Sequence, residues 1–417
     1  RDRSPSRGLG DVYKRQVPKD YDVATNATPE QVRHCFRRSR IIGRRFQIVH
    51  VLMGAETIEV TTFRGHHDQS GGNKAHTDDQ GRVLRDNVFG SEKEDAARRD
   101  FTVNALYFDP VSETIIDYHH GVADLKQKTL RMIGDPKTRY REDPVRIIRA
   151  VRFAAKLNAL GFTLDPKTVT PLIKSRELLA EVPQSRLFDE MLKLLQTGHS
   201  LASITQLKEL GMAQGIYPLL DLVVERANLP FVQAALQDTD RRVGEGKPVA
   251  PSFLLACVLW SDVRDGWAQR VRNQQHSHAA LQDAIEDVFS ARIGDVSGRG
   301  RLAADMREIW LMQPRFEKRV GSAPFGLVEQ ARFRAAFDFM RLRAENGELD
   351  EVLSDWWEEF SLADDNLRHD MVDEVKREQQ QRPRSPRAPR VHKLQGRARP
   401  PLDAELWSKS SFNSAML

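Results

Sequence analysis

Strand-like patterns in this chain are confined to the part before about residue 139, and the remainder has the pattern of helices. Residues 56–64 alternate between two kinds of side chain, as a strand with one buried face does. After residue 143, amphipathic or apolar segments recur at helical spacing, without an internal repeat of fixed length. The expected fold is therefore α+β: a mixed sheet with helices, followed by a long all-α region.

The composition fits a globular protein with a sizeable core. The chain has 417 residues, 40% of them hydrophobic. No run of apolar residues approaches the ~20 that a membrane span needs. Two cysteines, Cys35 and Cys257, are too few for a disulfide framework, which fits a reducing cytoplasm. The net charge is +5, and arginine dominates the basic residues, which favours nucleotides or nucleic acid as partners.

The residues after Val17 predict the order strand, helix, strand, hairpin, strand. Thr28–Gln31 has the sequence of a capped helix start, and this helix should reach about Arg38. The β-branched run 41–53 and the alternating run 56–64 should pair through a turn at Gly54.

Residues 65–90 are polar and glycine-rich, which predicts a loop. Ser91 and Glu94 form a second capping box, which predicts a helix to about Phe108. The further elements expected are strands at 115–117 and 130–133 around a turn at Gly121, a helix from Asp143 to about Leu157, and helical segments at 187–195, 201–210, 253–260, 306–312, 333–342 and 352–360.

Asp20 and Asp22 stand two residues apart in a predicted strand, so their side chains should leave the same face. Two close carboxylates repel each other unless a cation lies between them. Oxygen ligands suit Mg²⁺, which also holds substrate phosphates. Glu59 lies on a strand expected to pair beside this one and could supply a third carboxylate. The ordinary alternative is a solvated strand end or turn.

A segment within the predicted helix 91–108 concentrates charged and polar residues. It contains Arg98, Arg99, Asp100 and Asn104. Guanidiniums suit triphosphate oxygens. Asp100 and Asn104 would share one helix face and could bind a ribose or support the metal site. The ordinary alternative is a network of surface ion pairs.

A third set of residues lies at the start of the predicted helix after Asp143. Arg146, Arg149 and Arg152 recur every three residues and form a cationic stripe, whereas a solvated face would mix both signs. Glu142 and Asp143 stand at the helix start, where the helix dipole favours negative charge. A carboxylate and an arginine together can present a donor–acceptor edge to a base, and the arginines further along can hold phosphates.

In order and spacing, these motifs resemble the bacterial poly(A) polymerase and class II CCA-adding nucleotidyltransferase superfamily over about residues 17–200. They are Lys19-Asp20-Tyr21-Asp22, Arg98-Arg99-Asp100-Phe101-Thr102-x-Asn104, and Glu142-Asp143-Pro144-x-Arg146 with Arg149-Ala150-x-Arg152-Phe153. The resemblance implies a polymerase-β-like nucleotidyltransferase head, with a mixed sheet and helices, followed by an all-α neck, body and tail.

The resemblance also implies roles for individual residues. Asp20 and Asp22 would bind two catalytic Mg²⁺ ions, which Mn²⁺ could replace, and Asp100 would belong to the same active site. Glu142, Asp143 and Arg146 would read the incoming base. The remaining nucleotide-binding candidates are Arg98, Arg99, Asn104, Arg149 and Arg152, and Glu59 is a further catalytic candidate.

Within the superfamily, two features resemble the poly(A) polymerase branch: the run Ile41–Phe46 followed by His50, and a tail rich in arginine and proline. RNA binding is expected of Arg44, Arg45, Arg382, Arg384, Arg387 and Arg390. The implied activity is template-independent transfer of AMP from ATP to RNA 3′ ends, which promotes RNA turnover. Proteins of RNA turnover are expected as further partners, and no membrane is involved.

Two departures from the family pattern keep alternatives open. The family has a Gly-Gly-x-x-Arg-Asp loop before the Asp-x-Asp motif, and this chain has none. The head is therefore expected to be truncated at its N-terminus and impaired in activity. His120 stands where the family's flexible element, here 117–125, has a glycine. A CCA-adding tRNA nucleotidyltransferase and an inactive RNA-binding fragment are the alternative functions.

The expected domain organisation follows from these patterns. It comprises a non-native leader at 1–16, the nucleotidyltransferase head at 17–138, a helical neck that binds RNA and nucleotide at 139–200, a helical body and C-terminal arm at 201–375, and a disordered basic tail at 376–417. The tail is assigned from the composition of residues 376–399, where basic residues far outnumber acidic ones and apolar side chains are scarce.

Overall fold

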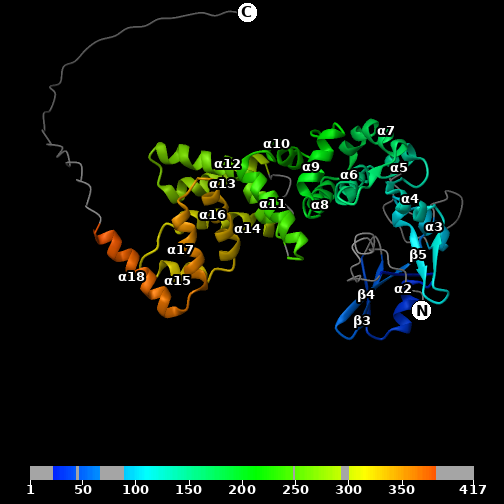
Figure 1. Cartoon of the computed structure of the whole chain (residues 1–417), viewed down its shortest axis with the longest axis horizontal. Coiled ribbons are helices and arrows are strands. Elements are labelled where there is room, and N and C mark those ends of the chain that lie inside the picture. Colours follow the sequence, from blue (N-terminus) through cyan, green and yellow to red (C-terminus); the bar gives the residue numbers. More distant parts are fainter. Residues whose placement is uncertain (1–21, 44–46, 66–88, 248, 293–299, 382–417) are drawn as a thin grey trace, which may run out of the picture.

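The computed structural model describes residues 22–43, 47–65, 89–247, 249–292 and 300–381. Its elements follow a curved path, with the strands at one end and the last helices at the other (Figure 1). The strand-containing head (residues 22–133) consists of β1 (Asp22–Thr25), α2 (Pro29–Cys35), β2 (Ser39–Ile42), β3 (Ile48–Met53), β4 (Glu56–Thr62), α3 (Glu92–Ala97), η1 (Thr102–Asn104), β5 (Leu106–Asp109), β6 (Thr114–Asp117), α4 (Gly121–Gln127) and β7 (Thr129–Leu130).

The rest of the described chain is helical except for one short strand. It comprises α5 (Pro136–Glu142), α6 (Val145–Asn158), β8 (Thr163–Leu164), α7 (Pro166–Lys174), η2 (Arg176–Glu181), α8 (Gln184–Leu195), α9 (Ser200–Glu209), α10 (Pro218–Arg226), α11 (Pro230–Gly244), α12 (Pro251–Arg272), α13 (Ser277–Arg292), α14 (Gly300–Met312), η4 (Gln313–Arg315), α15 (Ala323–Val328), α16 (Phe333–Glu345), α17 (Glu351–Leu362) and α18 (Asp365–Gln381). The expected α+β class and the expected helices from Asp143 onward are confirmed.

The main sheet of the head has four strands in the order β1-β4-β3-β2. The β1–β4 pair is parallel, and the β4–β3 and β3–β2 pairs are antiparallel. One face of this sheet packs on Val32 of α2 through Val49, Val51 and Val60. The opposite face carries polar side chains at its centre, and Ala24 of β1 joins Ala96 of α3 in a buried cluster on that side. The sheet therefore has one closed apolar face and one polar face.

The helix start and the hairpin turn form where the sequence predicts them, but the run predicted as one strand over 41–53 forms two strands, β2 and β3, and the helix predicted to reach Arg38 ends at Cys35. The Thr28 hydroxyl accepts from Gln31 N at 3.3 Å, and the Gln31 side chain accepts from Thr28 N at 2.8 Å, so the capping box is confirmed. Gly54 has a φ of 67° in the hairpin turn, which a side chain would disfavour. Asp22 is the register partner of Glu59, as the predicted pairing of these strands requires.

The predicted helix from Ser91 to Phe108 is wrong beyond Ala97. Its start is correct, because Ser91 and Glu94 form the predicted capping box. The Arg98 and Arg99 carbonyls each accept from Arg139 Nη2 at 2.6 Å. In a continuing helix, those carbonyls would accept hydrogen bonds from the backbone N–H groups four residues later. The chain leaves the helix instead and continues into η1 and β5. Asp100 and Asn104 consequently do not share a helix face.

The predicted turn at Gly121 is also wrong, because Gly121 is the first residue of α4. The Asp117 carboxylate accepts from Gly121 N at 2.8 Å and from Val122 N at 2.9 Å, which satisfies the free amides of the helix start. His120 has a φ of 61°, the left-handed conformation that the glycine of the family pattern would adopt readily. The strand at 115–117 is confirmed, whereas the 130–133 strand is shorter and pairs with β8.

We expect Gly121→Ala to destabilise the protein by about 1–3 kcal/mol, the usual cost of overpacking. A β-carbon at Gly121 would lie 2.3 Å from the Thr102 carbonyl oxygen, so backbone would have to move. Gly326→Ala in α15 is the matched control, because a β-carbon there meets no atom within 4 Å. Urea denaturation of both variants tests this, and equal stability of the two would contradict the tight contact between α4 and η1.

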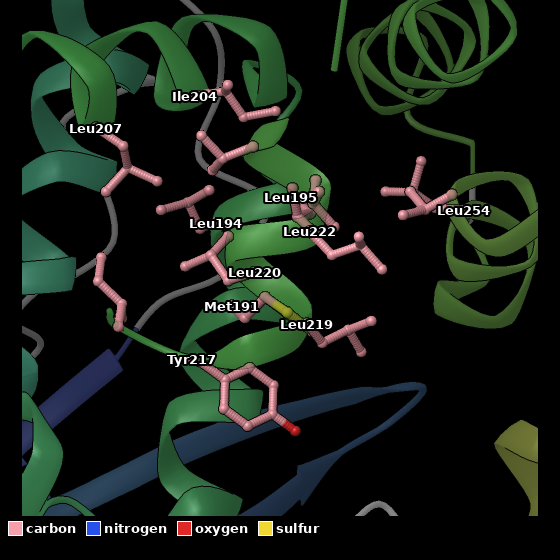
Figure 2. Packing of buried hydrophobic residues seen from close by; sticks show 14 of the residues in the cluster. Met191, Leu194, Leu195, Ile204, Leu207, Tyr217, Leu219, Leu220, Leu222 and Leu254 are labelled. Atoms are coloured by element: carbon pink, nitrogen blue, oxygen red, sulfur yellow. The ribbon is translucent and has the colours of Figure 1, made fainter. Parts of the chain in front are cut away.

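The largest core lies in the helical region and joins α8, α9, α10 and α12. Leucines from these helices gather in one apolar interior in Figure 2. Leu194 and Leu207 are fully buried there, and each such side chain contributes roughly 1.5–3 kcal/mol. A second core around Trp357 and Phe316 holds α15 to α18 together. The first core also contains Phe101 and Leu130, so it holds α6 and α8 against the head.

Two predictions from the composition can be compared with the structure. Cys35 is exposed, Cys257 is buried, and both are free thiols, so the absence of a disulfide framework is confirmed. Within the described ranges, the structure contains no helix whose length and apolar character would let it cross a membrane.

Candidate functional site

The polar face of the four-stranded sheet carries two of the predicted catalytic carboxylates. Asp22 and Glu59 are register partners on β1 and β4, so their side chains leave the same face. His50 Nε2 of β3 lies 3.6 Å from Glu59 Oε1. Asp20, the partner of Asp22 in the Asp-x-Asp motif, lies outside the described residues, as do the predicted RNA-binding residues Arg44 and Arg45. The tail residues Arg382, Arg384, Arg387 and Arg390 lie outside them too.

Asp100 is buried and connects the head to α6. Its Oδ1 accepts from Arg146 Nε at 3.0 Å, and Arg149 Nη2 lies 2.7 Å from its Oδ2. Ala96, four residues before Asp100, packs with Ala24, which lies two residues beyond Asp22 on the same face of β1. The segment carrying Asp100 therefore approaches the carboxylate face of the sheet, although its contacts are with the arginines of α6.

The carboxylates of this face have the donor chemistry of a divalent-cation site. Asp22 and Glu59 offer oxygen atoms, which hard cations such as Mg²⁺ prefer. Across the parts of the chain that the structure describes, no three His, Cys, Asp or Glu side chains group closely enough to hold a metal ion. The metal-binding roles of Asp20 and Asp22 stay predictions, and so does convergence of Asp100 on them.

The arginine stripe of α6 is not a free cationic surface. Arg146 and Arg149 pair with Asp100, and Arg152 Nη2 lies 3.8 Å from Glu190 Oε2 of α8. Burial lowers the pKa of the Arg152 guanidinium below its ordinary value, with the Glu190 charge acting in the opposite direction. Opposite charges therefore meet between elements rather than along one helix, which the local spacing of arginines cannot show.

The predicted base-reading residues are held in place by arginines. Glu142 Oε2 accepts from Arg146 Nη1 and from Arg139 Nη1, both at 3.0 Å. Asp143 Oδ2 accepts from Arg186 Nη2 of α8 at 3.1 Å. Sequence reasoning assigned no role to Arg139 or Arg186. The only local signal is the spacing of Arg139 three residues before Glu142; Arg186 is distant in sequence.

Arg98 and Arg99 converge on a carboxylate that the sequence analysis left without a role. Asp95 Oδ1 accepts from Arg98 Nη2 at 2.6 Å, and Asp95 Oδ2 accepts from Arg99 Nη2 at 3.1 Å. The Tyr107 hydroxyl donates to Oδ2 at 2.6 Å. Arg99 Nη1 also donates to the Asn104 carbonyl at 3.2 Å. These two arginines therefore stabilise the turn before η1, and their nucleotide-binding roles, like that of Asn104, stay predictions.

A double-mutant cycle on Asp100 and Arg146 should give a coupling energy of about 1–3 kcal/mol in the free energy of unfolding, the range for directly paired residues. Arg146 spans Asp100, Glu142 and the Arg139 carbonyl, so Arg146→Gln leaves a buried carboxylate with one cation fewer. Urea denaturation of Asp100→Asn, Arg146→Gln and the double variant measures the coupling. Arg141→Gln, an exposed neighbour, is the control. Additive effects of the two substitutions would show that the pair is not coupled.

Comparison with solved structures identifies the fold. The chain is similar to a tRNA-processing enzyme in an apo form, with a TM-score of 0.53 and 20% identity, over 91% of this chain and 96% of the other. It is also similar to a tRNA nucleotidyltransferase complexed with a primer tRNA and an incoming ATP analog, with a TM-score of 0.52 and 19% identity, over 90% and 96% of the two chains. The fold is that of the nucleotidyltransferase class.

Sequence comparison narrows this class. The family model "Poly A polymerase head domain" matches residues 9–131, "Probable RNA and SrmB-binding site of polymerase A" matches 161–223, and "Polymerase A arginine-rich C-terminus" matches 273–391. The chain is 40% identical over 389 residues to Poly(A) polymerase I of Escherichia coli O6:H1, which covers 91% of this chain and 83% of that protein. The chain belongs to the bacterial poly(A) polymerase I family, whose members are polynucleotide adenylyltransferases.

Two further relatives place the chain within the superfamily. Poly(A) polymerase I of Haemophilus influenzae is 39% identical over 379 residues, covering 88% of this chain and 83% of that protein. The CCA-adding enzyme of Bacillus velezensis is 36% identical over 224 residues, covering 53% of this chain and 54% of that enzyme. The family expected from the sequence motifs is thus confirmed.

Proposed function

We propose that this chain is a template-independent polynucleotide adenylyltransferase that transfers AMP from ATP to RNA 3′ ends in the cytoplasm and thereby promotes RNA turnover. The observation that carries the proposal is the 40% identity to a poly(A) polymerase I over 91% of the chain. The CCA-adding relative covers only 53% of the chain, which favours the polymerase over the tRNA-specific activity.

Asp22, together with Asp20, would hold two Mg²⁺ ions, or Mn²⁺ in their place, on the polar face of the sheet. Such ions supply Lewis-acid activation of the attacking hydroxyl and neutralise charge on the leaving pyrophosphate. Glu59, side by side with Asp22 in the register, would complete the carboxylate set. The contribution of this chain is to position both reactants on one side of the sheet, since nucleotidyl transfer depends mainly on orientation and charge.

The nucleotide would bind between this face and the start of α6. Arg146 is already held by Asp100 and Glu142, so its guanidinium is fixed before a base arrives, which favours selective recognition. Asp143 and Glu142 would contribute acceptors beside it. Arg149 and Arg152 would contact the phosphates of the nucleotide or the RNA. The phosphates would compete for these guanidiniums with the carboxylates of Asp100 and Glu190, which pair with them in the structure.

RNA contact would extend along the helical region. The match of residues 161–223 to an RNA-binding and protein-binding family model supports a partner surface on α7 to α10. Proteins that act in RNA turnover are the partners proposed there. Because the contacts would be largely with phosphates, RNA affinity should fall as the salt concentration rises.

Incubation with ATP or CTP separates the candidate functions. An RNA of unrelated sequence and a tRNA lacking its terminal CCA are supplied separately. Long adenylate tracts on both support the proposal. Stopping after completion of CCA on the tRNA alone would replace it with a CCA-adding activity. Salt-sensitive RNA binding without incorporation of either nucleotide would show an inactive RNA-binding protein and overturn it.

A further inference from the structure

We propose that the polar face of the sheet between β4 and β2, through His50 and Arg40, is the path along which the 3′-terminal nucleotides of RNA reach the carboxylates. This inference rests on the proposed function and adds to it the position and direction of the acceptor strand on the head. The path is defined by Glu59, His50 and Arg40.

The register of the sheet places these residues in one row. Glu59 of β4 pairs with His50 of β3, and His50 pairs with Arg40 of β2. Cross-strand partners point to the same face, and the 3.6 Å separation of His50 and Glu59 agrees with this. With Asp22 at the β1 end, the row crosses three strand spacings of about 4.8 Å, roughly 14 Å. At about 3.4 Å per stacked nucleotide, this is the length of about four nucleotides.

Among the residues that the structure describes, packing leaves the polar face accessible in the direction of β2. The other face is closed by α2, since Val32 packs on Val49 and Val60. On the polar face, the end of β1 at Ala24 is covered by Ala96 of α3. Arg40, by contrast, is exposed, and the Glu59 side chain is 35% exposed. A strand that ends at the carboxylates can therefore extend towards β2.

The order of charges along the row fits the 3′ end of an RNA strand. The carboxylates lie at β1 and β4, where the terminal hydroxyl would be activated. His50 and Arg40 lie on the next two strands, where upstream phosphates would follow, and arginine suits phosphate oxygens. Arg40 would therefore attract the anionic RNA strand, and only the carboxylates at the end of the row would repel it. A divalent cation bound by those carboxylates would remove this repulsion.

Apolar side chains beside the row favour RNA over a triphosphate as its ligand. Ile42 and Leu52 stand two residues from Arg40 and His50, on the same face of their strands, and are 36% and 45% exposed. A nucleoside triphosphate presents one base for its three phosphates, whereas a single strand presents one base for every phosphate. The bases of a strand pack on exposed apolar groups between phosphate contacts. The mixture of arginine and apolar side chains therefore matches a polynucleotide.

The test compares Arg40→Gln with Arg33→Gln, an exposed arginine of α2 on the opposite side of the sheet. Binding of a short oligoadenylate RNA is measured by fluorescence anisotropy at several salt concentrations. Arg40→Gln should reduce the slope of log K against log salt by about 0.7, the value for one phosphate contact on a single strand. Arg33→Gln should leave the slope unchanged, and Arg40→Lys should restore it, because the contact is with charge.

Two results would overturn the RNA path. One is an unchanged slope for Arg40→Gln; the other is a raised KM for ATP with unchanged RNA affinity, which would assign Arg40 to the nucleotide. Thermal unfolding of each variant verifies that the fold is intact. The anisotropy measurement of RNA binding contains no ATP. If the protein did not polymerise nucleotides, the proposed function would be contradicted, but the RNA path could still be tested by binding.

Discussion

Asp22→Asn should reduce nucleotide incorporation at least about a thousandfold, since a bound catalytic metal contributes several kcal/mol and each 1.36 kcal/mol is worth about tenfold in rate. The asparagine keeps the shape of the side chain and loses the charge that a cation requires. Asp22 lies on β1 beside Glu59, on the polar side of the sheet, so the fold should tolerate the change. RNA affinity should stay within about twofold, because the α6 to α10 surface is untouched.

The control for this variant is Glu56→Gln. Glu56 is the first residue of β4 and pairs with Met53. It lies an odd number of residues before Glu59, so its side chain faces the other side of the sheet. A second readout is the rise in unfolding temperature on addition of Mg²⁺, which wild type and Glu56→Gln should show and Asp22→Asn should lose. If Asp22→Asn still incorporated nucleotides, Asp22 would not be a ligand of the catalytic metal, whatever effect Mg²⁺ had on the unfolding temperature.

Much of the sheet was predictable because its signals are local. Alternation of side chains in β4, the capping box at Thr28 and the turn at Gly54 each depend on a few neighbouring residues, and all three occur as expected. The pairing of Asp22 with Glu59 followed from these elements once β1 was assigned. The long helix α6 is likewise a local pattern of apolar spacing.

The errors occur where distant residues decide the local conformation. The helix after Ser91 ends at Ala97 because Arg139, from α5, takes the carbonyls of Arg98 and Arg99. Spacing of apolar residues continued to favour a helix, but the buried Arg139 guanidinium needs acceptors for Nη2, and these two carbonyl oxygens supply them. The helix at Gly121 depends similarly on a carboxylate, Asp117, that precedes it in β6.

The candidate site shows the same division. The acidic and basic residues of the motifs were identifiable from residue type and spacing, whereas their partners were not. Asp100 meets Arg146 and Arg149 across 46 residues or more of sequence, and Asp143 meets Arg186 across 43. Residue type shows that a guanidinium needs an acceptor; only the fold determines which acceptor it finds.

Asp95→Asn should lower the free energy of unfolding by about 3–5 kcal/mol, the cost of removing one partner from a buried ion pair. Asp95 is 2% exposed and accepts from Arg98, Arg99 and the Tyr107 hydroxyl. The amide cannot satisfy two guanidiniums, which would then be half-buried charges without a counter-ion. Asp355→Asn, an exposed carboxylate of α17, is the control and should change stability by less than about 0.5 kcal/mol.

The pH dependence of this difference identifies its electrostatic origin. Burial raises the pKa of Asp95, but the charges of Arg98 and Arg99 outweigh burial, and the net pKa lies below its ordinary value of 3.8. A carboxylate with a lowered pKa stabilises the fold fully above the unfolded value, and this contribution is lost as the pH falls through the folded value. The stability difference between wild type and Asp95→Asn should therefore be constant at neutral pH and shrink below 3.8. Urea denaturation of both proteins from neutral pH down to about pH 3 measures this stability difference. A difference that does not change with pH would mean that Asp95 acts through its shape and hydrogen bonds rather than its charge.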